Sequence, residues 1–158
     1  MCMTAFVAKA QSIEVFFADH SGTSTNIRNA PNGKIVAKVP ADNNCMLTVE
    51  RPSNGWWVIS GNYYEEPDGE EHHLKGAKTF YVHSSCIGIA TRNYGGETLR
   101  LRSTPNAKGK VVYSFKEELV LHPVDVKNGW VKVKTDDGKH EGWIEEEWLC
   151  GNSVTNCC

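Results

Sequence analysis

The sequence predicts an all-β protein made of two consecutive small β-barrels, with about five short strands in each and at most a 3₁₀ turn. Three observations predict this class. The apolar runs are short, rich in β-formers and partly alternating; turn residues separate them; and four blocks of sequence recur in the same order. No window of about 11 residues has the apolar stripe of an amphipathic helix.

The predicted strands include residues 36–39, 46–49, 57–59 and 131–133. Asn, Asp and Gly tolerate the positive φ that tight hairpins require, so they mark the turns. The predicted turns are Pro31-Asn32-Gly33, Ser53-Asn54-Gly55, Asn128-Gly129 and Asp136-Asp137-Gly138. Residues 145–148 are predicted to form a single 3₁₀ turn.

An internal repeat divides the chain. The matched blocks are residues 27–32 with 101–106, 33–36 with 109–112, 54–59 with 128–133, and 80–88 with 142–150. The repeat predicts a first unit at residues 11–88 and a second at residues 89–152, with a tail at residues 153–158.

The first unit contains an extra segment, residues 61–79, which the second unit lacks. This segment is polar and includes Pro67, Gly69 and Gly76, so we expect a long hairpin at the surface. Packing or decoration is favoured for it over a contribution to a site.

Strand alternation assigns the side chains of the two matched hairpins. Val131 and Val133 share one face, which predicts that they point into the core and that Trp130 points away from it. By the same spacing, Trp57 is predicted to point inward and Trp56 outward.

The recurring motifs resemble those of bacterial SH3-like domains (SH3b, SH3 type 3) arranged in tandem. They are an Ile/Leu-Arg-x-x-Pro start, a central Asn-Gly-Trp hairpin and a terminal Gly-Trp-Ile before a short turn. The second unit is the closer match, at residues 101–105, 128–130 and 142–144. The resemblance covers nearly the whole chain from about Gln11 and implies a non-catalytic binding module.

The resemblance also implies a ligand groove lined by aromatic side chains. The matching positions are Trp130, Trp143 and Trp148 beside Glu145 in the second unit, and Trp56 and Tyr81 in the first. The tyrosine-rich opening strand of proline-binding members is missing, and Glu145 stands where they have a proline. A polyproline ligand is therefore not expected, whereas glutamates beside tryptophans suit a peptide that carries an amine. For any of these tryptophans, the alternative is that the ring fills a barrel or the interface between the units.

Two functions follow from these residues. The first is a binding module of the bacterial cell envelope, which recognises a peptide, a peptidoglycan peptide or a partner protein through the second barrel. The alternative is a structural or protein-interaction module with no small ligand, whose barrels assemble with each other or with a larger partner.

Composition argues against other partners. The chain has 17 basic and 19 acidic residues and a net charge of −2, which gives no support for nucleic-acid binding. No apolar run approaches the ~20 residues of a membrane-spanning helix.

No enzyme, cofactor or metal is expected from the sequence. Cys86 and His83 are close enough along the chain to be considered as a nucleophile and base, but Cys86 matches Trp148 of the repeat, a packing position. His72 and His73 stand in an acidic loop, and adjacent side chains of a strand point to opposite faces.

The cysteines and the N-terminus leave the compartment open. No C-x-x-C pair is present, Cys45 and Cys86 are expected to be small buried side chains, and a Cys150–Cys157 bridge is one option. Residues 1–10 read as the tail of a truncated signal peptide or as a frayed strand. The first reading favours a periplasmic or secreted protein, the second a cytoplasmic one.

Overall fold

The computed structural model describes residues 11–151. These residues form 14 strands and two single-turn 3₁₀ helices, so the predicted all-β class is confirmed. The expectations for residues 1–10 and 153–158 lie outside the described residues. In residues 11–151 no helix is long and apolar enough to cross a membrane.

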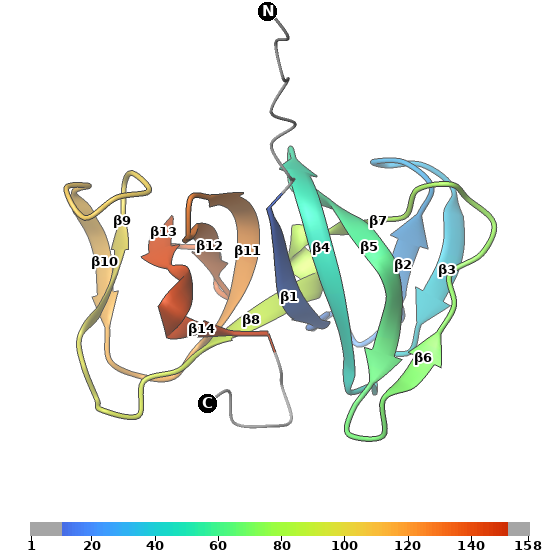
Figure 1. Cartoon of the computed structure of the whole chain (residues 1–158), viewed down its shortest axis with the longest axis horizontal. Helices are drawn as coiled ribbons and strands as arrows, with labels where there is room; N and C mark the ends of the chain where they lie inside the picture. Colours follow the sequence, from blue (N-terminus) through green and yellow to red (C-terminus); the bar gives the residue numbers. More distant parts are fainter. Residues whose placement is uncertain (1–10, 152–158) are drawn as a thin grey trace, which may run out of the picture.

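The strands fall into two groups that lie side by side (Figure 1). The N-terminal half contains β1 (Ser12–Phe17), β2 (Thr25–Arg28), β3 (Ile35–Val39), β4 (Cys45–Ser53), β5 (Trp56–Glu65), β6 (Glu70–His72), β7 (Tyr81–His83) and η1 (Ser84–Cys86). The C-terminal half contains β8 (Ile87–Thr91), β9 (Leu99–Arg102), β10 (Val111–Phe115), β11 (Val120–Lys127), β12 (Trp130–Thr135), β13 (Glu141–Glu145), η2 (Glu146–Trp148) and β14 (Leu149–Cys150).

The strand order reads the same from both ends. It runs β10-β9-β13-β12-β11-β8-β1-β4-β5-β7-β2-β3, with β14 beside β8 and β6 beside β5. Apart from β6 and β14, each strand thus has its equivalent at the mirrored position, for example β4 with β11, β5 with β12 and β7 with β13. The repeat in the sequence is a repeat of strand pairing.

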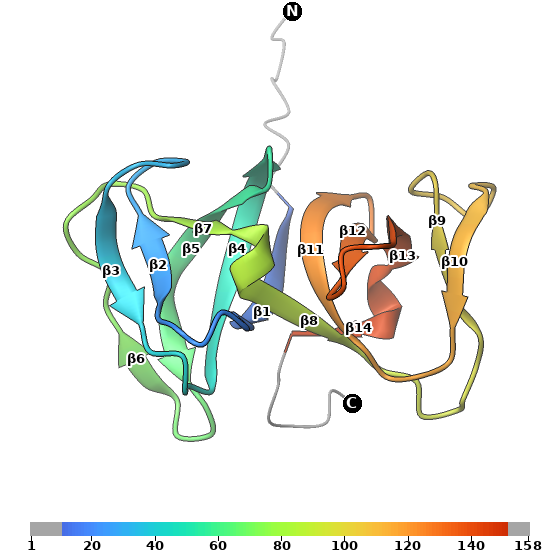
Figure 2. The same ribbon diagram turned by 180° about the vertical axis from the view of Figure 1, so that it is seen from behind.

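Strand β8 joins the halves (Figure 2). Its first residues, Ile87 and Gly88, pair with β1, and its next residues, Ile89 and Ala90, pair with β11. The predicted boundary between residues 88 and 89 therefore falls inside one strand.

The two predicted hairpin turns adopt the expected backbone. Asn54 and Asn128 both have φ of 49°, and Gly55 and Gly129 both have φ of 81°. These turns set the register of β4 with β5 and of β11 with β12, so that they place Trp56 and Trp130 at the start of matching strands.

The core confirms the predicted alternation. Trp57, Ile59, Val131 and Val133 are buried, whereas Trp56 and Trp130 are half-exposed. Most of the buried apolar side chains of both halves belong to one cluster, and Phe16, Ala18 and Met46 form a second, smaller one. The predicted 3₁₀ turn is also present, as η2.

A buried hydrogen bond fastens one half to the other. The indole Nε1 of Trp57, on β5, donates to the carbonyl oxygen of Pro123, on β11, at 2.8 Å. At the edge of this contact the Asn128 amide donates to Gln11 Oε1 at 2.8 Å. These two hydrogen bonds hold the halves against each other.

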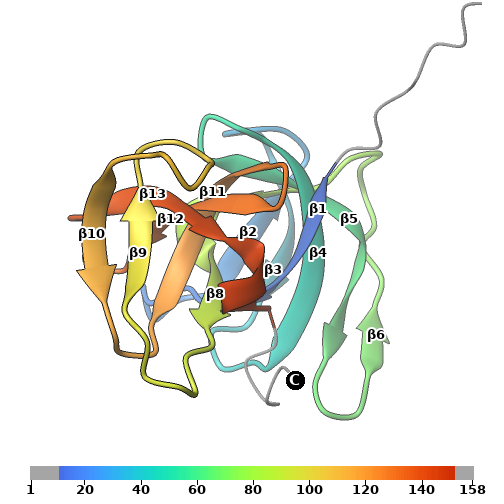
Figure 3. The ribbon, with the colours of Figure 1, turned by 60° about the vertical axis from the view of Figure 1, so that its left-hand side comes forward.

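The extra segment 61–79 extends β5 and pairs it with β6. The Tyr63 ring stacks on His72 with centroids 4.7 Å apart and meets Phe17 edge-on at 5.5 Å. This hairpin lies on the outer side of the N-terminal half, away from the C-terminal half (Figure 3). The ring contacts of Tyr63 are with residues of the N-terminal half alone.

The cysteines occupy different environments. Cys45 is buried in the core and Cys86 packs half-buried against it, as expected for small apolar side chains. Cys150 is disulfide-bonded. Cys157, considered above as its partner, lies outside the described residues.

Candidate functional site

Two of the three predicted tryptophans of the C-terminal half line one cavity. Trp130 begins β12 directly after the Asn128-Gly129 turn, and Glu145 stands opposite it across the β12–β13 pair. The single turn of η2 then brings Trp148 back to the same place. The cavity of about 250 Å³ is bordered by these three residues, by Glu147, and by Arg100 and Arg102 of β9.

Trp143 takes a different place. It is 8 % exposed, and its neighbours across the sheet are Lys132 and Arg102. It borders neither the cavity beside Trp148 nor the adjoining hollow of about 730 Å³ at Trp130. We name the surface formed by Trp130, Trp148, Glu145 and Glu147 the tryptophan groove.

The tryptophan groove holds competing negative charges. The pKa of Glu145 is raised, first by a hydrogen bond to the Glu147 carboxyl group, then by burial and by repulsion from Glu147. Arg102 acts in the opposite direction. Two carboxyl groups that share a hydrogen bond need a cation to ionise together without penalty.

The predicted residues of the N-terminal half lie elsewhere. Trp56 packs edge-on against His83 with ring centroids 5.1 Å apart. Tyr81 lies on β7 between Arg28 and Val58 of the neighbouring strands. Neither residue borders the tryptophan groove, so the structure does not join the two sets.

The Cys86–His83 pair lacks the contacts of a nucleophile and its base. His83 Nδ1 lies 2.8 Å from Ser85 Oγ and accepts from the Ser85 amide, and burial lowers its pKa. Burial, followed by the charge of Asp19, raises the pKa of the Cys86 thiol to about 11. No hydrogen bond connects Cys86 with His83 within residues 11–151, and such a thiol stays protonated at neutral pH.

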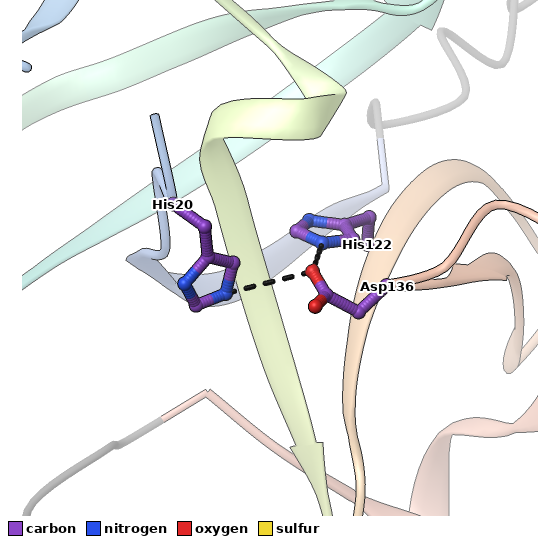
Figure 4. A group of neighbouring side chains, drawn as sticks. All are labelled: His20, His122 and Asp136. Carbon is purple, nitrogen blue, oxygen red and sulfur yellow. Dashed lines mark hydrogen bonds and ion pairs between the residues drawn. The ribbon is translucent and has the colours of Figure 1, made fainter. Parts of the chain in front are cut away.

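A second cluster, which the sequence analysis missed, lies where the halves meet (Figure 4). His20 follows β1, His122 is on β11, and Asp136 is in the turn after β12. Asp136 Oδ1 is 2.8 Å from His122 Nε2 and 3.5 Å from His20 Nε2. These residues border a cavity of about 420 Å³.

The surroundings of Asp136 favour the ionised form of its carboxyl group. Its pKa is lowered, chiefly by the hydrogen bond from His122; burial opposes this shift, and the charges of His20 and His122 add to it. The three residues are far apart in the sequence and match no short motif. The pairing of β11 with β12 places Asp136 beside His122, and the pairing of β8 with both β1 and β11 brings His20 to them.

Part of the chain is similar to a known family. Residues 97–149 match the model of the bacterial SH3 domain family, and this segment contains the whole tryptophan groove. The match covers one domain, so the tandem arrangement stays a prediction. No curated protein matches the chain.

Two solved structures resemble the chain weakly. The structure of NlpC1 from Trichomonas vaginalis has 12% sequence identity and a TM-score of 0.34, covering 94% of this chain and 50% of its own. NlpC2 from Trichomonas vaginalis has 10% identity and a TM-score of 0.34, covering 95% of this chain and 52% of its own. The chain spans about half the length of these two proteins.

Proposed function

We propose that this protein is a non-catalytic binding module of the bacterial cell envelope that recognises a peptide bearing an amine through the tryptophan groove. One observation carries the proposal: Trp130 and Trp148 share a cavity with Glu145 and Glu147, in the segment that matches the bacterial SH3 domain model. We further propose that residues 11–88 and 89–152 are two SH3-like barrels, which the mirrored strand order supports.

The walls of the groove differ in charge. Trp130 and Trp148 offer flat apolar area with attraction for a cation over the ring face. Glu145 and Glu147 add negative charge to the cavity, and Arg100 and Arg102 of β9 add positive charge to it. A short peptide that carries both an amine and a carboxylate matches this mixture of charges. Peptidoglycan stem peptides have both groups, as do many protein segments.

A titration followed by tryptophan fluorescence tests the groove. We expect a saturable change when a peptidoglycan stem peptide with a free side-chain amine is added to the full chain. Trp130→Ala should weaken binding roughly tenfold, because it removes one aromatic wall of the site. Acetylating the peptide amine should weaken binding by a similar factor.

The matched control is Trp56→Ala, which removes the equivalent tryptophan of the N-terminal half and should leave the dissociation constant unchanged. A titration without saturation contradicts the groove, as does equal weakening by both substitutions.

The groove should also respond to pH. An ammonium group binds best when Glu145 is ionised, and a carboxyl group is ionised above its pKa. Because the Glu145 pKa is raised, affinity for the amine peptide should fall with decreasing pH sooner than an ordinary glutamate would predict.

The variant Glu147→Gln tests whether Glu147 is the cause of the raised pKa of Glu145. A glutamine at this position has no charge to repel Glu145 and has an amide that can donate to it, so the midpoint of the affinity change should move to lower pH. Dissociation constants measured across the acidic range decide the matter. An unchanged midpoint would show that Glu147 does not control Glu145.

The alternative function is a structural or interaction module, and one observation favours it. Val111 and Val112 are exposed on β10, the strand that ends the sheet order. An edge strand with exposed β-branched side chains can pair with a strand of another chain. Sedimentation of the full chain tests the self-assembling form of this alternative, which requires a concentration-dependent dimer that Val112→Lys abolishes; assembly with a larger partner would leave the chain alone monomeric.

A further inference from the structure

We propose that His20, His122 and Asp136 form a binding site for a zinc-class divalent metal ion at the junction of the two halves. Two imidazole nitrogens and one carboxylate oxygen are a ligand set that Zn²⁺ accepts, with water in the fourth position. The site is separate from the tryptophan groove and does not depend on the function proposed for it.

The ligand atoms are already close to coordinating positions. One atom from each residue lies within 4.8 Å of the others. In a tetrahedral zinc site with ligand bonds near 2.0–2.1 Å, neighbouring ligand atoms are ~3.3 Å apart. The Asp136 Oδ1 distances of 2.8 Å to His122 Nε2 and 3.5 Å to His20 Nε2 lie on either side of this value. Exposed side chains at His20 and Asp136 can make the small remaining adjustment.

The orientation of His122 is set from behind. Its Nδ1 lies 2.7 Å from the carbonyl oxygen of Ile87, at the point where η1 passes into β8, and therefore donates to it. This fixes the ring, and in a neutral imidazole it leaves the lone pair on Nε2. A backbone carbonyl that holds the second nitrogen is the usual support of a metal-bound histidine.

The imidazole of His122 faces an oxygen acceptor at each of its two nitrogens. Nε2 of His122 faces Asp136 Oδ1, which is a second acceptor at 2.8 Å. Both ring nitrogens are satisfied only if Nε2 also carries a proton or if a metal ion takes the place of that proton. His20 Nε2, on the other side of the same carboxylate oxygen, supplies the third ligand (Figure 4).

The donor set selects among cations. Mg²⁺ and Ca²⁺ prefer shells of oxygen ligands, whereas imidazole favours Zn²⁺ and its first-row neighbours. Because His20 comes from the N-terminal half and the other two ligands from the C-terminal half, a bound ion would connect the halves directly. Zinc should therefore stabilise the folded chain as well as bind to it.

Cys45, Glu65 and His72 form a competing cluster in the N-terminal half. Cys45 is 4 % exposed, and burial raises the pKa of its thiol to about 11. A cysteine must lose its proton to bind a metal, so this cluster starts from an unfavourable state. The His72 ring is also stacked on Tyr63. The cluster of Cys45, Glu65 and His72 serves as the matched control.

The experiment is calorimetric titration of Zn²⁺ into the full chain, with thermal unfolding measured with and without Zn²⁺. We expect binding of one ion here and a higher Tm with zinc. His20→Ala and Asp136→Asn should each weaken this binding at least tenfold and remove the rise in Tm. Both positions are exposed, so unfolding without metal shows whether the variants remain folded. Cys45→Ser and His72→Ala, in the control cluster, should bind as the native chain does.

The absorption spectrum of the Co²⁺-loaded chain identifies the ligands. Nitrogen and oxygen ligands give visible bands without the intense near-ultraviolet band of cobalt–thiolate bonds, and we expect the former. The proposal is overturned by unchanged zinc affinity in both His20→Ala and Asp136→Asn, by loss of binding in Cys45→Ser, or by equal affinity for Mg²⁺.

Discussion

Replacing Trp57 with alanine should lower the free energy of unfolding by about 3–5 kcal/mol, the usual cost of removing a large ring from a core. Trp57 is fully buried and donates its indole N–H to the Pro123 carbonyl of the other half. The substitution therefore leaves a cavity at the junction and removes the indole donor to the Pro123 carbonyl. Urea denaturation of the full chain measures the effect.

Two further variants separate the contributions of the ring volume and of the indole hydrogen bond to this loss of stability. Trp57→Phe keeps most of the apolar volume but removes the donor, so it should cost about 1–3 kcal/mol. Trp56→Ala removes the half-exposed neighbour, whose ring contact with His83 is worth about 1 kcal/mol. If Trp57→Ala cost no more than Trp56→Ala, the junction would not depend on the buried indole.

Gly142→Ala should lower the free energy of unfolding by about 1–3 kcal/mol, the usual cost of overpacking. A Cβ at this position would lie 2.9 Å from the Arg102 carbonyl oxygen, and equally near Leu101 Cβ and Val112 Cγ2. The backbone of β13 passes so close to β9 that only glycine fits. Thermal or urea unfolding would detect the loss.

Gly95→Ala is the matched control. Neither glycine has a positive φ, and the nearest atoms to a Cβ at Gly95 belong to the flexible Glu97 side chain at 3.7 Å. Its effect should stay within about 0.5 kcal/mol. Equal effects of the two substitutions would argue that the close approach of β13 to β9 does not constrain the fold.

Local chemistry explains what was predictable. Asn54-Gly55 and Asn128-Gly129 identify their turns because few other residues adopt positive φ. Trp57 and Val131 were predicted to point inward because side chains alternate along a strand. Each of these properties depends on neighbours in the sequence.

The candidate site residues also differ in whether their contacts depend on neighbouring strands alone or on the wider packing. The resemblance placed Trp130, Glu145 and Trp143 together, and the first two do meet, because a hairpin joins their strands. Trp143 was placed with them by resemblance, but the structure buries it between Lys132 and Arg102. Which face of a packed strand borders a cavity depends on the strands next to it.

By itself, the sequence determined the all-β class, the repeated order of elements, the hairpin turns and the inward side chains. Tertiary structure alone decided that β8 pairs with both β1 and β11, that Trp57 reaches Pro123, and that His20 meets His122 and Asp136. The physical reason is range: turn conformation and alternation act over a few residues. Contacts between the halves exist only after long loops have closed and both sheets have formed.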